Sequence, residues 1–596
     1  MQNAPSRRLT MNATKIALIG SSALAAFSLG ACGKITSPDS ADRDTGPEGA
    51  MSCPGEVQAA LLLANPSVAL LEPSPDGRFV AGLVDYDWLS GWGNLVVFDL
   101  SSGTSSGIVA TGVTGPLVFT AEGADLLFPD SVSAVWGDGY LTWGLSTWSA
   151  IDGSVRSIAS NVVDIVLSPF SSSVLVYRTP DGTFAYDFTG RSVQTLGTGR
   201  TPCLFESDSG FTCLPVYFTE DHGLFWADDL VAGGLSTGGA ITGTLRHSDA
   251  NAPSAASILA ESVTGFRPSA DGSAVLVARD PTFDDSPECG GCPRGDLVVV
   301  ATDGSFSRTL LAQARYASPA EDAALSPDGA LVAFQDPDRN PTTVTLLSLS
   351  DGAQRWAEEG CQPEPPAIVS GSVLVWKDIW TGTEVDRGAD AISSSTATAR
   401  VRLGEQLRAW MADTVDPGEA RVLAVAEYPD VATGYEGSVR VRLWDLGDGL
   451  PSERPASELD SSPAFNASSF DQDGENLLML TEYHDDWRGR LVAALAPDSA
   501  LRDVSRTDRA HDGAWIGEWV AFLEDTEDGT SAPVAFSRVP FEADPIQLGH
   551  SVHLVAGVPG ECPRAVFADC AGPLIDEAAC AHAAPGIYLA ALGSGP

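Results

Sequence analysis

Few residues in this chain have the types and the spacing that catalysis would require. Gly234–Gly238 reads GLSTG and matches the G-x-S-x-G pattern of a serine nucleophile, which needs a tight strand-to-helix turn. No helical pattern follows it, so we predict a glycine-rich loop. His550 and His553 are three residues apart and would face opposite sides of a strand, which makes them a poor metal pair. We therefore predict no catalytic residue.

Two acidic segments could bind a cation or transfer protons. His484 is followed by two aspartates, and Asp525–Gly529 reads DTEDG, which is part of a calcium loop without its alternating carboxylates. The chain has 79 Asp and Glu residues against 34 Lys and Arg, so we prefer to interpret both segments as solvated loops. No cofactor is expected, and Ca²⁺ is the one ion that we leave open.

Three tryptophans occupy corresponding loops of two repeats that are defined below: Trp88, Trp92 and Trp487. Exposed aromatic side chains on loops are suited to contact with a protein or a carbohydrate. The alternative is that these side chains pack between repeats. Together with His484, they are the candidate binding residues.

The cysteines indicate disulfides, as expected for an exported chain. Cys203 and Cys213 flank one short segment and are expected to pair. Cys289 and Cys292 form a CGGC sequence, which could be a metal half-site, a redox pair or a loop disulfide. A zinc site would need a second pair of ligands, so we favour the loop disulfide.

The remaining disulfide candidates lie near the ends of the repeat region. Cys53 precedes the first repeat, and three others follow the last one: Cys562, Cys570 and Cys580. If the repeats close into a ring, its two ends meet, and we expect Cys53 to pair with one of those three. Nine cysteines remain once Cys32 is set aside, so at least one lacks an intramolecular partner.

The N-terminal segment indicates export. The only charges before residue 34 are Arg7, Arg8 and Lys15, and the apolar run Ile16–Phe27 follows them. This run is too short to span a bilayer, which takes about 20 residues, but it is typical of a secretory signal peptide. Met1 and Met11 both remain candidate starts.

Leu29–Cys32 (LGAC) resembles a bacterial lipobox, with a branched apolar residue and two small ones before the cysteine. The resemblance implies that residues 1–31 are a signal peptide and that Cys32 carries lipid; the alternative is ordinary cleavage beside an unrelated cysteine. Gly33 in the following position favours the outer membrane among such lipoproteins. Residues 32–55 have no apolar periodicity and are expected to form a flexible tether.

The charge of the chain limits its partners. A net charge of −45 repels phosphate backbones, so nucleic acid is not expected to bind. Anionic lipid is repelled for the same reason, and membrane attachment would depend on the acyl chains. The expected partner is therefore a protein or a glycan.

A repeated unit fills the rest of the chain. Ser74–Gly77 reads SPDG and precedes RFVAGLVDY, Ser326–Gly329 repeats it before ALVAFQD, and close variants begin at Ser269 and Asp471. Asp and Gly favour chain reversal at these turns, and each turn leads into an apolar strand. Counting weaker copies, ten units recur at a mean step of about 48 residues, which is typical of a propeller blade.

This step predicts an all-β fold over residues 56–596, namely a β-propeller of four-stranded blades. Because propellers usually have four to eight blades, we expect one ring of about seven to eight blades. Two rings with a boundary near residues 361–366 are the alternative. Glu56–Leu63 is one of the few runs with a helical period.

The SPDG pattern resembles the repeats of TolB-like and WD-type propellers. This resemblance implies a fold more than an activity. Here it would be carried on a bacterial lipoprotein of the cell envelope, facing the periplasm or the cell surface. We expect a non-enzymatic binding or scaffold module. The alternatives are a propeller enzyme, a lyase or hydrolase with carboxylates in a central channel, and a purely structural envelope protein.

Overall fold

A computed structural model describes residues 57–592 apart from short internal gaps, the longest of which are 413–420, 428–437 and 572–579. Residues 1–56 and 593–596 lie outside the described part. Residues Gly49–Pro596 form one compact unit. Within the described residues, no helix has the length and apolarity needed to cross a membrane.

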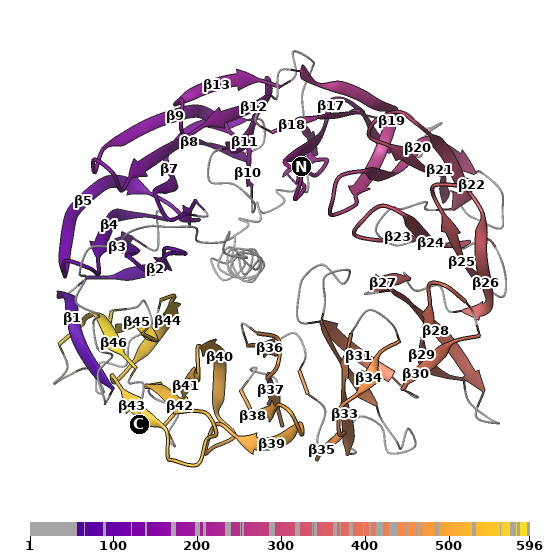
Figure 1. Cartoon of the computed structure of the whole chain (residues 1–596). Helices are drawn as coiled ribbons and strands as arrows, with labels where there is room; N and C mark the ends of the chain where they lie inside the picture. Colours follow the sequence, from indigo (N-terminus) through magenta and orange to yellow (C-terminus); the bar gives the residue numbers. More distant parts are fainter. Residues whose placement is uncertain are drawn as a thin grey trace, which may run out of the picture. The chain divides into compact units, whose positions relative to one another are not determined.

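The described residues form a series of antiparallel units of about four strands each, which we call sheets 1 to 11 in chain order (Figure 1). Some neighbouring units are joined by hydrogen bonds into larger sheets, namely sheets 4 and 5 through β19 (Ser257–Pro268) and sheets 6 and 7 through β26 (Gln354–Cys361) and β28 (Ser372–Trp380). Sheets 1 to 3 contain β2 (Val68–Pro73), β3 (Phe79–Asp87), β4 (Trp92–Asp99), β5 (Thr104–Val113); β6 (Val118–Phe119), β7 (Asp125–Trp136), β8 (Tyr140–Ser149), β9 (Val155–Val162); and β10 (Asp164–Leu167), β11 (Val174–Thr179), β12 (Gly182–Asp187), β13 (Ser192–Thr195).

A two-stranded hairpin separates sheets 3 and 4 and consists of β14 (Cys203–Glu206) and β15 (Gly210–Cys213). Sheets 4 and 5 share a long strand, β19, whose first half pairs with β18 and whose second half pairs with β20. Their strands are β16 (Tyr217–Phe218), β17 (Gly223–Ala232), β18 (Ile241–Asp249), β19 (Ser257–Pro268), β20 (Ala274–Asp284), β21 (Cys292–Ala301) and β22 (Ser307–Arg315).

Sheets 6 to 8 follow the same order of strands. They contain β23 (Ala323–Leu325), β24 (Leu331–Asp336), β25 (Thr342–Ser348), β26 (Gln354–Cys361); β27 (Ala367–Val369), β28 (Ser372–Trp380), β29 (Val385–Ser393), β30 (Arg400–Gly404); and β31 (Leu407–Ala412), β32 (Val422–Glu427), β33 (Val439–Asp445) with the short outer strands β34 (Ser452–Glu453) and β35 (Ser457–Leu459).

The last three sheets complete the series. They contain β36 (Ser469–Phe470), β37 (Leu477–Thr481), β38 (Arg490–Leu495), β39 (Ala500–Asp503); β40 (Ala510–Ile516), β41 (Trp519–Glu524), β42 (Val534–Arg538), β43 (Ile546–Leu548); and β44 (Val552–Val558), β45 (Arg564–Asp569), β46 (Gly586–Ala591). The fourth strand of sheet 11 comes from the other end of the chain: β1 (Gln58–Ala64) pairs antiparallel with β46.

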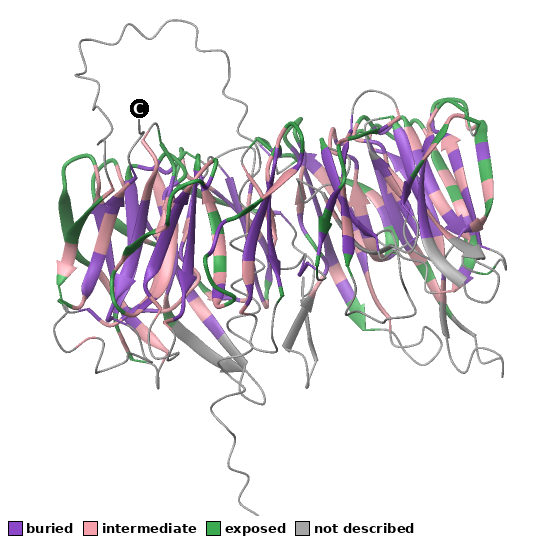
Figure 2. Ribbon diagram, turned by 90° about the horizontal axis from the view of Figure 1, so that it is seen from below, coloured by how far each residue is buried: buried purple, intermediate pink, exposed green. Residues whose placement is uncertain are grey.

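The hydrophobic core lies between the sheets. Second and third strands are apolar at nearly every position and are buried along most of their length, as β41 and β45 illustrate, because a neighbouring sheet covers each face (Figure 2). Eleven clusters of buried residues each join one sheet to the next. One of them joins the last sheet to the first, through Val566 and Ile587 of sheet 11 and Val80 and Phe98 of sheet 1.

The succession of sheets is therefore circular, and the predicted all-β propeller is confirmed. The number of sheets, eleven among the described residues, exceeds the seven or eight that we expected. Nine of the ten units counted in the sequence correspond to sheets 1 to 3 and 5 to 10. The unit placed at Asp208 falls between β14 and β15 of the hairpin, so the repeat count missed sheet 4 as well as sheet 11.

The SPDG turn shows why a polar tetrapeptide begins so many sheets. The Ser74 hydroxyl donates to Asp76 Oδ1 over 2.5 Å, and the same carboxylate oxygen accepts the Arg78 amide over 3.0 Å. The Phe79 amide donates to Ser74 Oγ over 2.8 Å. Gly77 has a φ of 66°, which glycine adopts without steric strain. The turn thus satisfies its own buried polar groups and directs β3 back along β2.

Turns of neighbouring sheets also bond one another. The Asp271 amide donates to Pro327 O over 3.0 Å, and the Glu220 amide donates to Ala270 O over 3.0 Å. The first bond links sheets 5 and 6, and the second links sheets 4 and 5. We call this side of the sheets, where first strands end and second strands begin, the turn edge.

Candidate functional site

The opposite side of the sheets carries the polar clusters, and we call it the loop edge. It is where the first strand of each sheet begins and the second strand ends. Four second strands place a carboxylate there with left-handed backbone: Asp85 (φ 50°), Asp229 (55°), Asp280 (53°) and Glu482 (51°). The pairing register shifts at the first three of these positions. Such bulges bend a strand and re-aim its side chains.

Arginines on third strands hold carboxylates at this edge, and Asp229 is one of them. Arg246 Nε lies 2.7 Å from Asp228 Oδ2, and its Nη2 lies 3.2 Å from Asp229 Oδ2. In sheet 8, Arg442 Nη2 lies 2.9 Å from Glu427 Oε2. Each pair ties the end of a second strand to the start of the third. These ion pairs fix the hairpin ends at the loop edge. The same ion pairs already engage the carboxylates.

A histidine between two carboxylates lies at the loop edge of sheet 10. His511 Nδ1 is 2.8 Å from Asp512 Oδ2, and its Nε2 is 3.6 Å from Asp525 Oδ1. Arg488, which precedes β38 of sheet 9, places Nε 2.7 Å from Asp525 Oδ2. The cluster therefore joins two sheets, which also pair through a bridge between Gly489 and Ala510.

The charges around His511 alter its protonation. Burial disfavours the charged ring, but the hydrogen bond to Asp512 and the charges of Asp512 and Asp525 outweigh it and raise the pKa of His511. The bond to the ring in turn lowers the pKa of Asp512. A histidine held in this way can accept and release a proton near neutral pH. This arrangement is the strongest candidate for acid–base chemistry in the described residues.

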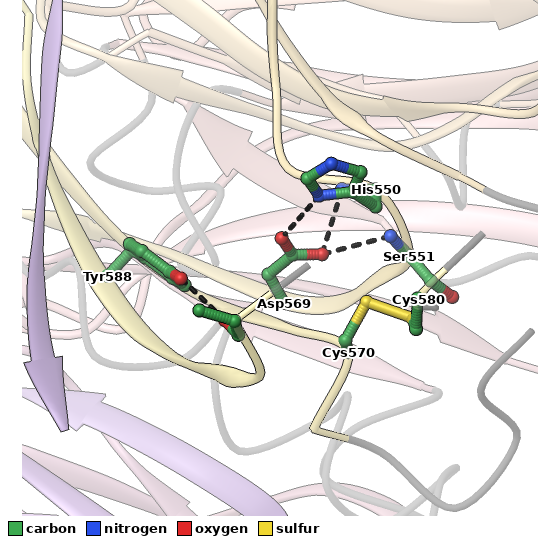
Figure 3. Close-up of a disulfide and its surroundings, with 7 residues drawn as sticks. His550, Ser551, Asp569, Cys570, Cys580 and Tyr588 are labelled. Atoms are coloured by element: carbon green, nitrogen blue, oxygen red, sulfur yellow. Dashed lines mark hydrogen bonds and ion pairs between the residues drawn. A yellow bond between two sulfur atoms is a disulfide. The ribbon is translucent and has the colours of Figure 1, made fainter. Parts of the chain in front are cut away.

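A second histidine–carboxylate pair occupies the loop edge of sheet 11 (Figure 3). Asp569 ends β45, and its Oδ1 accepts the amides of His550 over 2.8 Å and Ser551 over 2.9 Å. Its Oδ2 lies 3.1 Å from His550 Nδ1. Because Asp569 is only 4% exposed and engages two backbone amides, its main role is to fix the turn before β44.

His553 contacts a different group. Its Nε2 lies 3.0 Å from the carbonyl oxygen of Val68 in β2, and the Val68 amide donates to Ala571 O over 2.7 Å. The two histidines of the HSVH sequence thus have separate partners, and His553 helps to join sheet 11 to sheet 1. In the part of the chain that the structure describes, no group of three potential ligands is placed to hold a metal ion.

The cysteines are partly described. Cys570 and Cys580 form a disulfide directly after β45 (Figure 3). Cys213 is disulfide-bonded and lies opposite Cys203 in the β14–β15 ladder, as expected for the predicted pair. Cys562 is also disulfide-bonded.

The prediction for Cys53 stays open, because Cys53 lies outside the described residues. Cys289 also lies outside them, so the CGGC disulfide is untested. With Cys570 and Cys580 joined to each other, Cys562 is the one candidate left of the three that the sequence offered as a partner for Cys53. Cys361 is a free, buried thiol, and burial raises its pKa to about 11.

Of the candidate binding residues, Trp92 begins β4 and is partly buried. Trp88, Trp487 and His484 lie outside the described residues, as do Cys32 and the Gly234–Gly238 sequence. Asp525 of the DTEDG segment belongs to the His511 cluster instead of a calcium loop.

No sequence pattern indicates one further acidic residue of interest, Glu72 of β2. Glu72 lies on the first strand of sheet 1, and burial raises its pKa from 4.5 to about 7. A folded-state pKa above the unfolded value means that the native chain binds this proton more tightly. Its stabilising contribution is complete below about pH 4.5 and is lost as the pH rises through about 7.

Replacing Glu72 with glutamine should remove this pH dependence. Between pH 5 and pH 8, the parent should lose about 2 kcal/mol of unfolding free energy relative to Glu72→Gln, after allowance for partial exposure. Urea unfolding of both chains at the two pH values measures the difference. The contributions of all other carboxylates to the pH dependence cancel, because both chains contain them. Equal pH dependence in the two chains would contradict the burial of an ionisable Glu72.

No protein-family model and no curated protein matches the sequence. Among solved structures, a eukaryotic initiation factor is 12% identical, with 66% of this chain and 88% of that chain covered and a TM-score of 0.36. Porphyromonas gingivalis dipeptidyl peptidase 4 is 11% identical, with 85% of this chain and 65% of that chain covered and a TM-score of 0.35.

The β-propeller domain of the Trilobed protease from Pyrococcus furiosus is 12% identical, with 55% of this chain and 92% of that domain covered and a TM-score of 0.26. These proteins are similar to the chain in propeller architecture alone. Identities and TM-scores this low carry no information about activity, so function must be argued from the residues.

Proposed function

We propose that the chain is a bacterial outer-membrane lipoprotein whose propeller binds a protein or a glycan at its loop edge. The lipobox-like LGAC sequence at Leu29–Cys32 supports the anchor. Because the chain is acidic, anionic lipid does not attract it, and its attachment to the membrane would depend on the acyl chains. The propeller itself supplies the binding surface.

The difference between the two edges carries the proposal. At the turn edge, neighbouring turns bond each other directly. At the loop edge, the second and third strands are connected by segments of unequal length, from Asp87–Trp92 in sheet 1 to Asp569–Gly586 in sheet 11. Variable connections on a rigid scaffold are the usual place for recognition, and the arginine–carboxylate pairs fix the strands that bear them.

Binding can be tested with two apolar substitutions on opposite edges. Trp92→Ala removes an aromatic side chain at the loop edge, while Ile151→Ala removes one that is 80% exposed in the turn between β8 and β9. Cross-linking in cells followed by mass spectrometry should recover at least tenfold less partner with Trp92→Ala and an unchanged amount with Ile151→Ala. Equal recovery of every partner with both variants would favour a purely structural role.

The anchor has a separate test. Metabolic labelling with a palmitate analogue should mark the parent and leave Cys32→Ala unlabelled. If Cys32→Ala is labelled as strongly as the parent, the lipoprotein assignment is wrong.

One observation favours an enzyme as the second candidate. His511 between Asp512 and Asp525 has the geometry of a general acid or base. If the parent cleaves any member of a panel of polysaccharides or peptides and His511→Gln does not, the enzyme replaces the binding module as the better account.

A further inference from the structure

Most outermost strands of the sheets lie at a sheet edge, although β19 pairs with β20 and β26 pairs with β28 at one position. Most of these strands carry charged residues. Examples are Arg308 and Arg315 of β22, Glu358 and Glu359 of β26, and Arg400 of β30. Charges on an exposed edge strand prevent it from pairing with another chain or resting on an apolar surface. A long outer strand without charged residues lacks this protection.

Two outer strands of more than four residues have no charged residue in the part of the chain that is described. They are β1, with the sequence QAALLLA, and β5, with the sequence TSSGIVATGV. Both are largely exposed and present bulky aliphatic side chains: Leu61 is 47% exposed and Ile108 is 58% exposed. The uncharged outer strands β13 and β43 have only four and three residues.

The two strands belong to adjacent sheets, one on each side of the ring closure (Figure 1). Leu62 and Leu63 of β1 pack against the cluster that joins sheet 11 to sheet 1, and Phe98 of β4 is part of that cluster. Next to β4 in sheet 1 lies β5. The outer strands β1 and β5 are therefore neighbours on the outer surface of the ring. We call this uncharged part of the surface the β1–β5 rim.

This rim is also where the chain arrives from its N-terminal part. Only 25 residues separate Cys32 from Gln58, the first residue of β1. If these residues form the tether expected from the sequence, a coil of that length has an end-to-end distance of about 25–30 Å. If Cys32 is acylated, the bilayer surface is therefore always within reach of β1.

We propose that the β1–β5 rim rests on the bilayer surface, with Leu61 and Ile108 among the lipid headgroups. This inference rests on the proposed anchor at Cys32. The net charge of −45 is repelled by anionic lipid, so an uncharged sector is the part of the rim that can approach. The unpaired backbone groups of an edge strand need hydration, which limits the contact to the headgroup region.

The test places a fluorescent label at equivalent exposed positions around the rim. Single variants Leu61→Cys, Ile108→Cys and Ile258→Cys, the last on the outer strand β19 and 54% exposed, are each labelled with bimane. The unsubstituted chain shows the background from its buried thiol, Cys361. Each acylated chain is reconstituted into phosphatidylcholine vesicles with and without nitroxide-labelled lipid, and flotation confirms that it is attached.

We expect nitroxide lipid to quench the labels at positions 61 and 108 at least twofold more than the label at 258. Equal quenching at the three positions in a chain that floats would overturn the rim contact and leave the anchor standing. A chain that does not float would overturn both. A cross-linked dimer through Leu61→Cys, without quenching, would place a second copy on the rim and overturn the membrane contact.

Discussion

Replacing Gly77 with alanine will lower the free energy of unfolding by about 4 kcal/mol or more. Gly77 adopts a φ of 66°, and a Cβ at this position would lie 1.7 Å from the carbonyl oxygen of Pro559 in the first turn of sheet 11. The added Cβ would collide with a backbone atom, which cannot move aside as the end of a flexible side chain could. Relief would require sheets 1 and 11 to separate.

Gly103→Ala is the matched control for this experiment. Gly103 has the same φ of 66°, yet a Cβ there would meet nothing within 4 Å. It should therefore lose only the roughly 1–2 kcal/mol of left-handed strain. Urea unfolding of both variants separates strain from collision. If the two variants are equally destabilised, the close approach of the first and last sheets is wrong.

Removing the Cys570–Cys580 disulfide should lower the unfolding free energy by about 3 kcal/mol. The bond closes a loop with a sequence separation of 10 and so restricts the unfolded chain. It also fixes a segment that joins three parts of the ring. The Cys570 amide donates to Ser551 O over 3.0 Å, and Ala571 O accepts the amide of Val68.

The experiment compares Cys570→Ser/Cys580→Ser with the parent by urea unfolding under non-reducing conditions. Cys361→Ala, which removes the buried free thiol, controls for the loss of a cysteine that forms no bond. Its effect should come only from the small cavity that it leaves. A double variant that unfolds at the same urea concentration as the parent would show that the disulfide contributes nothing to closing the ring.

The repeat pattern predicted the fold because its causes are local. A Ser–Asp–Gly turn satisfies its own hydrogen bonds, and the apolar strand after it needs cover on two faces, so the sequence alone indicates stacked sheets. Nine of the ten counted units correspond to sheets of the ring, and the unit at Asp208 falls in the β14–β15 hairpin. The blade number was wrong because the usual range of propellers was given more weight than the count.

Two further errors have physical causes. The run Glu56–Leu63 has a helical period, yet residues 58–64 form β1. Its partner, β46, lies more than 500 residues away in the sequence, and no local pattern contains that information. Sheets 4 and 11 were missed because their first turns, around Asp221 and around Pro559, do not repeat the SPDG pattern.

The candidate site was less predictable than the fold. Asp525 was predicted to lie in a solvated loop, but it is buried in the loop after β41 and contacts His511 of its own sheet and Arg488 of the neighbouring one. The raised pKa of Glu72 depends on burial in the first strand of sheet 1, which composition does not reveal. Contacts between sheets decide both, and a single sequence does not state which sheets are neighbours.

The pairing of β1 with β46 has a consequence for how the molecule is made. The ribosome delivers β1 among the first segments and its partner among the last, so in every nascent chain β1 stays unpaired until translation is nearly complete. A product truncated before Gly586 can never pair it. A protease that recognises unpaired strands would therefore remove unfinished copies and spare finished ones, in which β46 pairs with one edge of β1.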